Sequence, residues 1–232
     1  MNLKKYIASL DILRKIFFPI LRRLDIRFLI LHPFTLRPFY LKFWSHKGYW
    51  YYAKQREEKE IFLLRRLISK GDNILEIGAH IGFITQIFEK LVSKDGKVIA
   101  IEPSPNNFKL LKLNTKKKTE TYQLALSDER KKGKLYIDNF GGFTNSIKED
   151  FAENRTKFFS QKQKFKIQPL AQIEINIETI DSICEMKNFI PTFIKIDVEG
   201  AEYEVLKGSL NTLPLVKGIM IEIGKQNKLK IF

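Results

Sequence analysis

The pattern of hydrophobic and polar positions changes near residue 56. Beyond this point, short apolar runs alternate with segments whose apolar residues recur at helical spacing. Short apolar strands that alternate with helices are typical of a parallel sheet covered by helices on both faces. The sequence therefore predicts an α/β fold with a doubly wound, mostly parallel sheet. The predicted strands are 73–77, 97–101, 121–126, 192–196 and 217–223, and the predicted helices are 57–69, 85–94, 106–114 and 201–207.

One segment interrupts this alternation. It contains two predicted strands, 134–138 and 172–179, with a glycine pair and a long polar stretch between them. We interpret it as an insertion at about 133–179, and we expect it to lie near the rim of the active site.

The start of the chain follows a different pattern. Apolar residues recur at helical spacing over 3–17, with basic residues between them, until Pro19 interrupts the helix. A second apolar and basic stretch, 20–31, leads into a connector rich in proline and aromatic residues. The sequence therefore predicts a helical, basic, aromatic-rich N-terminal region, 1–56, followed by one larger domain, 57–232.

Basic charge is concentrated in this N-terminal region. The chain has 41 Lys and Arg against 26 Asp and Glu, a net charge of +15, and the first 56 residues contribute +10 of it. A basic amphipathic helix with bulky apolar residues suits an anionic membrane surface. It equally suits a helical cap whose charges are solvated, or a substrate-binding role, and the sequence leaves these readings open.

Composition excludes several classes of protein. Hydrophobic residues are 44% and charged residues 29% of the chain, so wholesale disorder is excluded. The longest run without a charged residue, 77–88, is shorter than the ~18 residues that a membrane-spanning helix needs. The single cysteine, Cys184, cannot form an internal disulfide, and the three histidines lack metal-ligand spacing. We therefore expect a cytoplasmic protein, and we assign no residue as a metal ligand.

The first predicted strand leads into a glycine-containing turn, 76–82. In open α/β sheets, ligands bind beyond the carboxyl ends of the strands. Gly78 suits a tight turn, and Gly82 suits the close approach of a ligand or a helix. Glu76 places a negative charge beside this turn, which suits a ligand with an ammonium group better than a pyrophosphate. The turn therefore favours S-adenosylmethionine over a dinucleotide.

Carboxylates also follow two other predicted strands. Glu102 ends the second strand, where an acidic side chain accepts hydrogen bonds from ribose hydroxyls. Asp197 and Glu199 follow the strand 192–196, so they reach the same edge of the sheet. A cluster of carboxylates can raise the pKa of one member and prepare a general base, or it can hold a divalent metal ion. Both roles stay open for Asp197 and Glu199.

Together these motifs resemble the FkbM family of S-adenosylmethionine-dependent methyltransferases. The resemblance spans about 57–223, and its motifs are 75–85, 101–104, 125–128, 179–182 and 194–202. It implies a Rossmann-like class I methyltransferase fold and, commonly, O-methylation of sugars or other natural-product hydroxyls. It also implies the cofactor contacts: Glu76, Gly78 and Gly82 at the methionine half, Ala79 and His80 in the same turn, Glu102 at the ribose, and Ser127 with Asp128 beside the adenine.

We therefore expect an S-adenosylmethionine-dependent methyltransferase that acts on a hydroxyl of a glycan, a lipid-linked glycan or a related natural product. The acceptor contacts are expected in the insertion and the N-terminal region. Contact with an anionic membrane at its inner face, and a homo-oligomer, are further expectations. One rival is an RNA methyltransferase, which the basic charge suits, although RNA-binding motifs are missing and nucleic acid is disfavoured. A second rival is a catalytically silent membrane-associated protein that keeps the fold.

Overall fold

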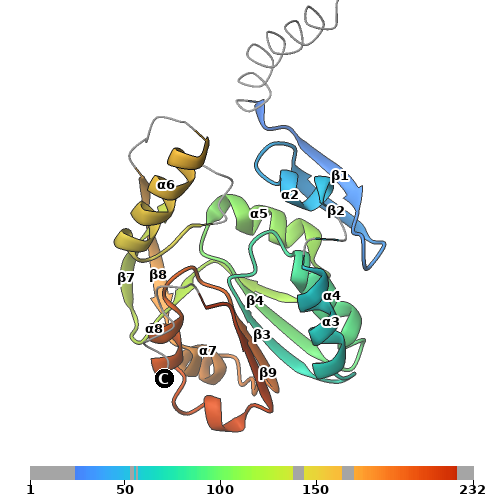
Figure 1. The fold of residues 1–232 in the computed structure, drawn as a ribbon. Helices are drawn as coiled ribbons and strands as arrows, with labels where there is room; N and C mark the ends of the chain where they lie inside the picture. The colour runs from blue at the N-terminus through green and yellow to red at the C-terminus, as the bar shows by residue number, and fades with distance from the viewer. Residues whose placement is uncertain (1–23, 53–54, 56, 138–143, 164–169, 224–232) are drawn as a thin grey trace, which may run out of the picture.

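The computed structural model in Figure 1 shows an α/β protein built on a central parallel sheet. The sheet has five strands in the order β10-β9-β3-β4-β5, and every neighbouring pair is parallel. The predicted fold class is confirmed. The strands are β3 (Asn73–Ile77), β4 (Lys97–Ile101), β5 (Glu120–Tyr122), β9 (Phe193–Ile196) and β10 (Gly218–Ile221). The structure describes residues 24–52, 55, 57–137, 144–163 and 170–223.

Helices cover both faces of this sheet, and alternating strand residues separate two cores. Ile74 and Val98 face one core, with α3 (Glu58–Leu67) and α4 (Phe83–Leu91). Leu75 and Ile99 face the other core, with α7 (Ile180–Met186) and α8 (Glu202–Lys207). Because side chains alternate along a strand, Glu76 lies on the same face of β3 as Ile74.

A smaller sheet stands beside the central one. Its strand order is β6-β8-β7, and the long helix α6 connects β7 to β8. The predicted third strand, 121–126, is in fact two strands, because the chain leaves the central sheet after β5 and pairs with β8 instead. The polar stretch of the insertion forms α6. The bounds are β6 (Ala125–Leu126), β7 (Lys131–Ile137), α6 (Glu149–Gln163) and β8 (Ala171–Glu178).

The described part of the N-terminal region differs from the helical prediction. It forms an antiparallel hairpin, β1 (Arg27–Leu31) and β2 (Pro38–Lys42), followed by the short helix α2 (Lys47–Tyr51). The reason is an alternation with a period of two: Phe28 and Ile30 pair with Leu41 and Phe39, and these four side chains pack together on the core of α3 and α4. The predicted helix over 3–17 lies outside the described residues.

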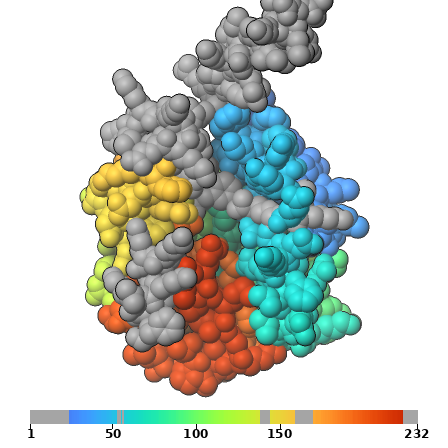
Figure 2. Space-filling view, in the orientation of Figure 1, coloured from blue at the N-terminus to red at the C-terminus, as the bar shows by residue number. Residues whose placement is uncertain are grey.

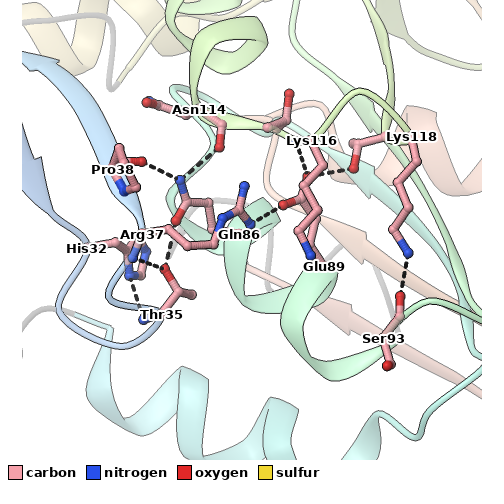
Figure 3. Close-up of polar contacts among 12 residues, drawn as sticks. His32, Thr35, Arg37, Pro38, Gln86, Glu89, Ser93, Asn114, Lys116 and Lys118 are labelled. Atoms are coloured by element: carbon pink, nitrogen blue, oxygen red, sulfur yellow. Dashed lines mark hydrogen bonds and ion pairs between the residues drawn. The ribbon is translucent and has the colours of Figure 1, made fainter.

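A polar network fixes the hairpin to α4 and to α5 (Pro105–Asn114), as Figure 3 shows. The Gln86 side-chain amide donates to the carbonyl oxygens of Pro38, at 3.0 Å, and Asn114, at 2.8 Å. Glu89 is buried and binds Arg37, and it also accepts from the Lys116 backbone N–H at 2.7 Å. The hairpin is therefore part of the folded core, since buried polar groups on α4 depend on it.

Candidate active site

A cavity of about 600 Å³ opens at the carboxyl edge of the central sheet. The strand order of the sheet reverses there, because β4 and β9 lie on opposite sides of β3. Figure 2 shows a recess between α6, in yellow, and the α2 to α3 region, in blue to cyan. Ligands of open α/β sheets bind at such switch points. The cavity is therefore the candidate active site.

The glycine turn after β3 forms the floor of the cavity. Gly78 has a φ of +83°, and a Cβ atom there would lie 1.7 Å from the carbonyl oxygen of Asp197. The backbone N–H groups of Gly78 and Ala79 both donate to the Ile101 carbonyl oxygen at 2.9 Å. Only glycine fits at this position, because the turn is pressed between the ends of β4 and β9.

Glu76 lies in the cavity wall with 1% of its surface exposed. Its Oε2 atom is buried and has no hydrogen-bond partner among the residues that the structure describes. Burial raises the pKa of Glu76 to about 8, although the nearby charge of Lys195 opposes this shift. An unpartnered carboxylate oxygen beside a cavity is a site for a cationic hydrogen-bond donor.

Glu102 ties the turn to the end of β4. Its Oε2 accepts from the His80 backbone N–H at 2.9 Å, and its Oε1 accepts from the Ser104 backbone N–H at 3.0 Å. Burial raises its pKa to about 7, and these backbone donors oppose the shift. A carboxylate has about four acceptor positions, so Glu102 can still accept a hydrogen bond from a ligand hydroxyl in the cavity.

Lys195 and Glu60 also belong to the site, although neither was predicted from the sequence. The Lys195 Nζ atom is buried and lies 3.0 Å from Asp197 Oδ2 and 3.5 Å from Glu60 Oε1. Burial alone lowers the pKa of Lys195, but the carboxylates of Asp197, Glu60 and Glu76 raise it above its ordinary value. Lys195 is therefore protonated and holds Asp197 in place. The sequence did carry a signal for this role, because a lysine inside an otherwise apolar strand needs a carboxylate partner.

Glu199 stands next to Asp197 in the loop after β9. Its backbone has a φ of +52°, and its carbonyl oxygen accepts from Ser146 Oγ at 2.8 Å, which ties the loop to the insertion. Burial first, and then the charge of Asp197, raises the pKa of Glu199 to about 8, while Arg155 opposes the shift. A carboxylate with this pKa can accept a proton at neutral to mildly basic pH.

The N-terminal region and the insertion complete the cavity. Trp44, Tyr49 and Tyr52 line one wall, and Arg155 of α6 lines another. The Tyr49 hydroxyl lies 3.1 Å from His80 Nδ1, and the two rings stack with their centroids 5.9 Å apart. The structure thus brings both segments that were expected to contact the acceptor to the cavity.

Three of the sequence-predicted residues lie outside the cavity wall. Gly82 faces α5, where a Cβ atom would lie 3.0 Å from Leu111 Cδ1, so its close approach serves helix packing. Ser127 is buried and bonds Asp128, whose other carboxylate oxygen lies 3.3 Å from Lys207 Nζ. The residues just before this pair, Leu124, Ala125 and Leu126, are the ones that line the cavity. The wall does include Glu76, Gly78, Ala79, His80, Glu102, Asp197 and Glu199.

Two features are absent from the part of the chain that the structure describes, a metal-binding cluster and a membrane-spanning helix. No group of three or more His, Cys, Asp or Glu side chains in this part of the chain is placed to hold a metal ion. Within the same residues, no helix combines the length and the apolar character that crossing a membrane requires.

The fold and the cavity define a Rossmann-like α/β protein with a ligand site at the switch point of its sheet. Residues 76–230 match the family described as the methyltransferase FkbM domain. This match covers more than half of the chain, so the chain belongs to the FkbM methyltransferase family.

Other comparisons add little to this assignment. No significant match was found among curated proteins. A solved structure of Aeropyrum pernix fibrillarin in complex with natively bound S-adenosyl-L-methionine is 17% identical, with a TM-score of 0.26, and the match covers 37% of this chain and 36% of that one. A putative rRNA-methylase from Clostridium thermocellum is 11% identical, with a TM-score of 0.28, over 52% of this chain and 95% of that one. The chain thus spans about a third of the length of the fibrillarin. Scores this low give no information about the substrate of the present protein.

Proposed function

We propose that this methyltransferase uses S-adenosylmethionine to methylate a hydroxyl group of a glycan, a lipid-linked glycan or a related natural product. The observation that carries the proposal is the division of the carboxylates around one cavity. Glu76 and Glu102 flank the glycine turn, whereas Asp197 and Glu199 follow β9. The first pair suits the cofactor, and the second pair suits the acceptor.

The first pair fits S-adenosylmethionine chemically. The unpartnered Oε2 of Glu76 would accept a hydrogen bond from the ammonium of the methionine half. Glu102, which the backbone of His80 and Ser104 holds in place, would accept from the ribose hydroxyls. The cofactor, when bound, supplies a methyl group on a positively charged sulfur, and the protein has to align the acceptor with it.

The second pair suits the removal of a proton from the acceptor hydroxyl. We assign Glu199 as the general base, because its pKa of about 8 matches the demand for a proton acceptor near neutral pH. We assign Asp197 to orienting the hydroxyl, because the contact with Lys195 Nζ fixes its carboxylate. The proton would move from the hydroxyl to a carboxylate oxygen of Glu199 while the methyl carbon exchanges its bond to the cofactor sulfur for a bond to the acceptor oxygen, so that the sulfur leaves as a neutral thioether.

The charge and the aromatic rings of the cavity support a neutral, sugar-like acceptor. The carboxyl groups of Glu57, Glu60 and Glu222 bring the acidic side chains in the cavity wall to seven, against three basic ones, Lys47, Arg155 and Lys195. The wall therefore lacks the excess of positive charge that suits a phosphate-rich acceptor such as RNA. Trp44 and Tyr52 offer flat aromatic surfaces that can pack against a sugar ring. The rival RNA function is therefore disfavoured by the cavity itself.

The cofactor assignment predicts a defined loss on changing Glu102. Glu102→Ala should weaken S-adenosylmethionine binding by ~2 to 3 kcal/mol, because it removes a charged acceptor of the ribose hydroxyls. Isothermal titration calorimetry measures this affinity. The matched control is Asn107→Ala, which removes a side-chain donor 3.3 Å from Glu102 Oε1 but leaves the carboxylate. An affinity of Glu102→Ala equal to that of the control would contradict the assignment.

The acceptor class is tested by transfer of a labelled methyl group from S-adenosylmethionine into fractionated cell extract. We expect label in glycan or lipid-linked glycan, and the methyl group should be released only by reagents that cleave ethers. Label in RNA or protein would overturn the acceptor class but keep the methyltransferase. A protein that binds no S-adenosylmethionine would instead support the catalytically silent rival.

A further inference from the structure

The N-terminal hairpin and α3 carry large apolar side chains that point away from the core. On the hairpin these are Leu29, Leu31 and Leu36, and Leu31 is 65% exposed. On α3 they are Phe62, Leu63 and Leu67, and Phe62 is 58% exposed. We call these six side chains the outer face. Several large, exposed apolar side chains on two adjoining elements indicate an interaction site.

The outer face is not a by-product of core packing. In the hairpin, Phe28 and Ile30 already supply the buried side, and their neighbours Leu29 and Leu31 point the other way. In α3, Ile61 and Leu64 form the buried side of the helix, and Ile68, which follows the last helical residue, is buried with them. Both elements are therefore apolar on two sides, whereas a surface element with one partner needs only one apolar side.

The hairpin and α3 approach each other at the turn between β1 and β2. Phe34, in the turn between β1 and β2, has its ring 5.8 Å from the Arg65 guanidinium of α3. Figure 2 shows the hairpin, in blue, and α3, in cyan, on the same side of the molecule. Both elements are therefore open to a partner that approaches this side of the molecule.

Basic side chains accompany the outer face. Arg65 and Arg66 are exposed on α3, and the Arg66 guanidinium lies 5.5 Å from the centre of the Phe62 ring. Arg27 is exposed on β1 and lies 5.9 Å from the centre of the Tyr40 ring. Arginines beside aromatic and aliphatic side chains suit the boundary between lipid headgroups and acyl chains.

We propose that the outer face binds the surface of an anionic lipid bilayer. Apolar side chains would enter the headgroup boundary, and the arginines would contact lipid phosphates and carboxylates. Glu60 of α3 lines the cavity, so the helix that would contact the bilayer also forms part of the acceptor site. That consequence, access to a lipid-linked acceptor, rests on the proposed function, whereas the lipid binding itself does not.

The experiment is sedimentation of the full-length protein with vesicles of phosphatidylcholine, with and without phosphatidylserine. We expect the wild type to sediment with the anionic vesicles at low salt and to be released as salt is added. Each cation at an anionic surface accounts for about a 5-fold change in partitioning, so Arg65→Gln with Arg66→Gln should weaken binding about 30-fold. Leu31→Ser with Phe62→Ser should weaken it at least about 10-fold.

Matched controls carry the same changes at exposed positions elsewhere. Ile190→Ser with Leu210→Ser, and Lys132→Gln with Lys134→Gln, should bind as the wild type does. All four double variants change exposed side chains, and thermal melting verifies that they fold. The proposal is wrong if the wild type stays in the supernatant, or if controls and outer-face variants lose binding equally. It is also wrong if only the arginine variant loses binding, because that result indicates a general polyanion site such as one for RNA. Since no methyl transfer is measured, failure here leaves the proposed function untouched.

Discussion

Glu199→Gln is expected to lower the rate of methyl transfer about 100-fold or more, since an amide cannot accept the proton of the acceptor hydroxyl. The wild-type rate should rise with pH and level off above about 8, as the Glu199 carboxyl ionises. In the variant this rise should disappear. Single-turnover transfer of labelled methyl groups across a pH series measures both effects, and calorimetry should show S-adenosylmethionine binding close to that of the wild type.

Asp197→Asn is the informative comparison for this prediction. The charge of Asp197 is one cause of the raised pKa of Glu199, so its removal should shift the pH profile to lower pH. The rate should also fall, because the amide no longer pairs with Lys195 Nζ and orients the hydroxyl less well. If Asp197→Asn abolishes the pH dependence and Glu199→Gln keeps it, the two roles are reversed. If neither variant slows transfer, both residues are structural.

Glu76→Gln is expected to stabilise the ligand-free protein and to weaken cofactor binding at the same time. Burial raises the pKa of Glu76 to about 8 in the folded state, from 4.5. The folded state therefore favours the protonated form, and this stability is complete below about pH 4.5 and is lost as the pH rises through 8. Glutamine does not ionise, so at pH 8 to 9 its free energy of unfolding should exceed that of the wild type by about 4 kcal/mol.

Cofactor affinity should change in the opposite direction. Loss of the ionised partner of the ammonium should weaken S-adenosylmethionine binding about 10- to 100-fold at pH 8, and much less at pH 6, where Glu76 is protonated. Urea denaturation and calorimetry at both pH values measure the two effects. The control is Glu89→Gln, since Glu89 is buried but bound to Arg37 and to the Thr119 hydroxyl, so its replacement should destabilise the fold. A destabilised Glu76→Gln protein would contradict the burial argument.

The central sheet could be predicted from local patterns. β3 and β4 have the predicted bounds, because each is a short apolar run that both neighbouring helical layers bury. Gly78 could be predicted for a similar reason, since the tight turn needs a residue without a side chain. The hairpin could not, because Pro33 and Pro38 and the scattered basic residues conceal the two-residue period of its strands. The helix α6 was also missed, since its polar sequence carries only a weak apolar stripe.

The sequence by itself determined the α/β class, the family resemblance and the carboxylates at three strand ends, because these depend on residues that are close together in the chain. Only the tertiary structure decided which of them share a cavity. Lys195 reaches Glu60 across 135 positions of sequence, and Tyr49 reaches His80 from α2, the short helix that follows the hairpin. It also decided the protonation of Glu76 and Glu199, since a pKa depends on burial and on charges that folding brings near. Contacts and burial of this kind arise from packing between distant segments, which no local pattern records.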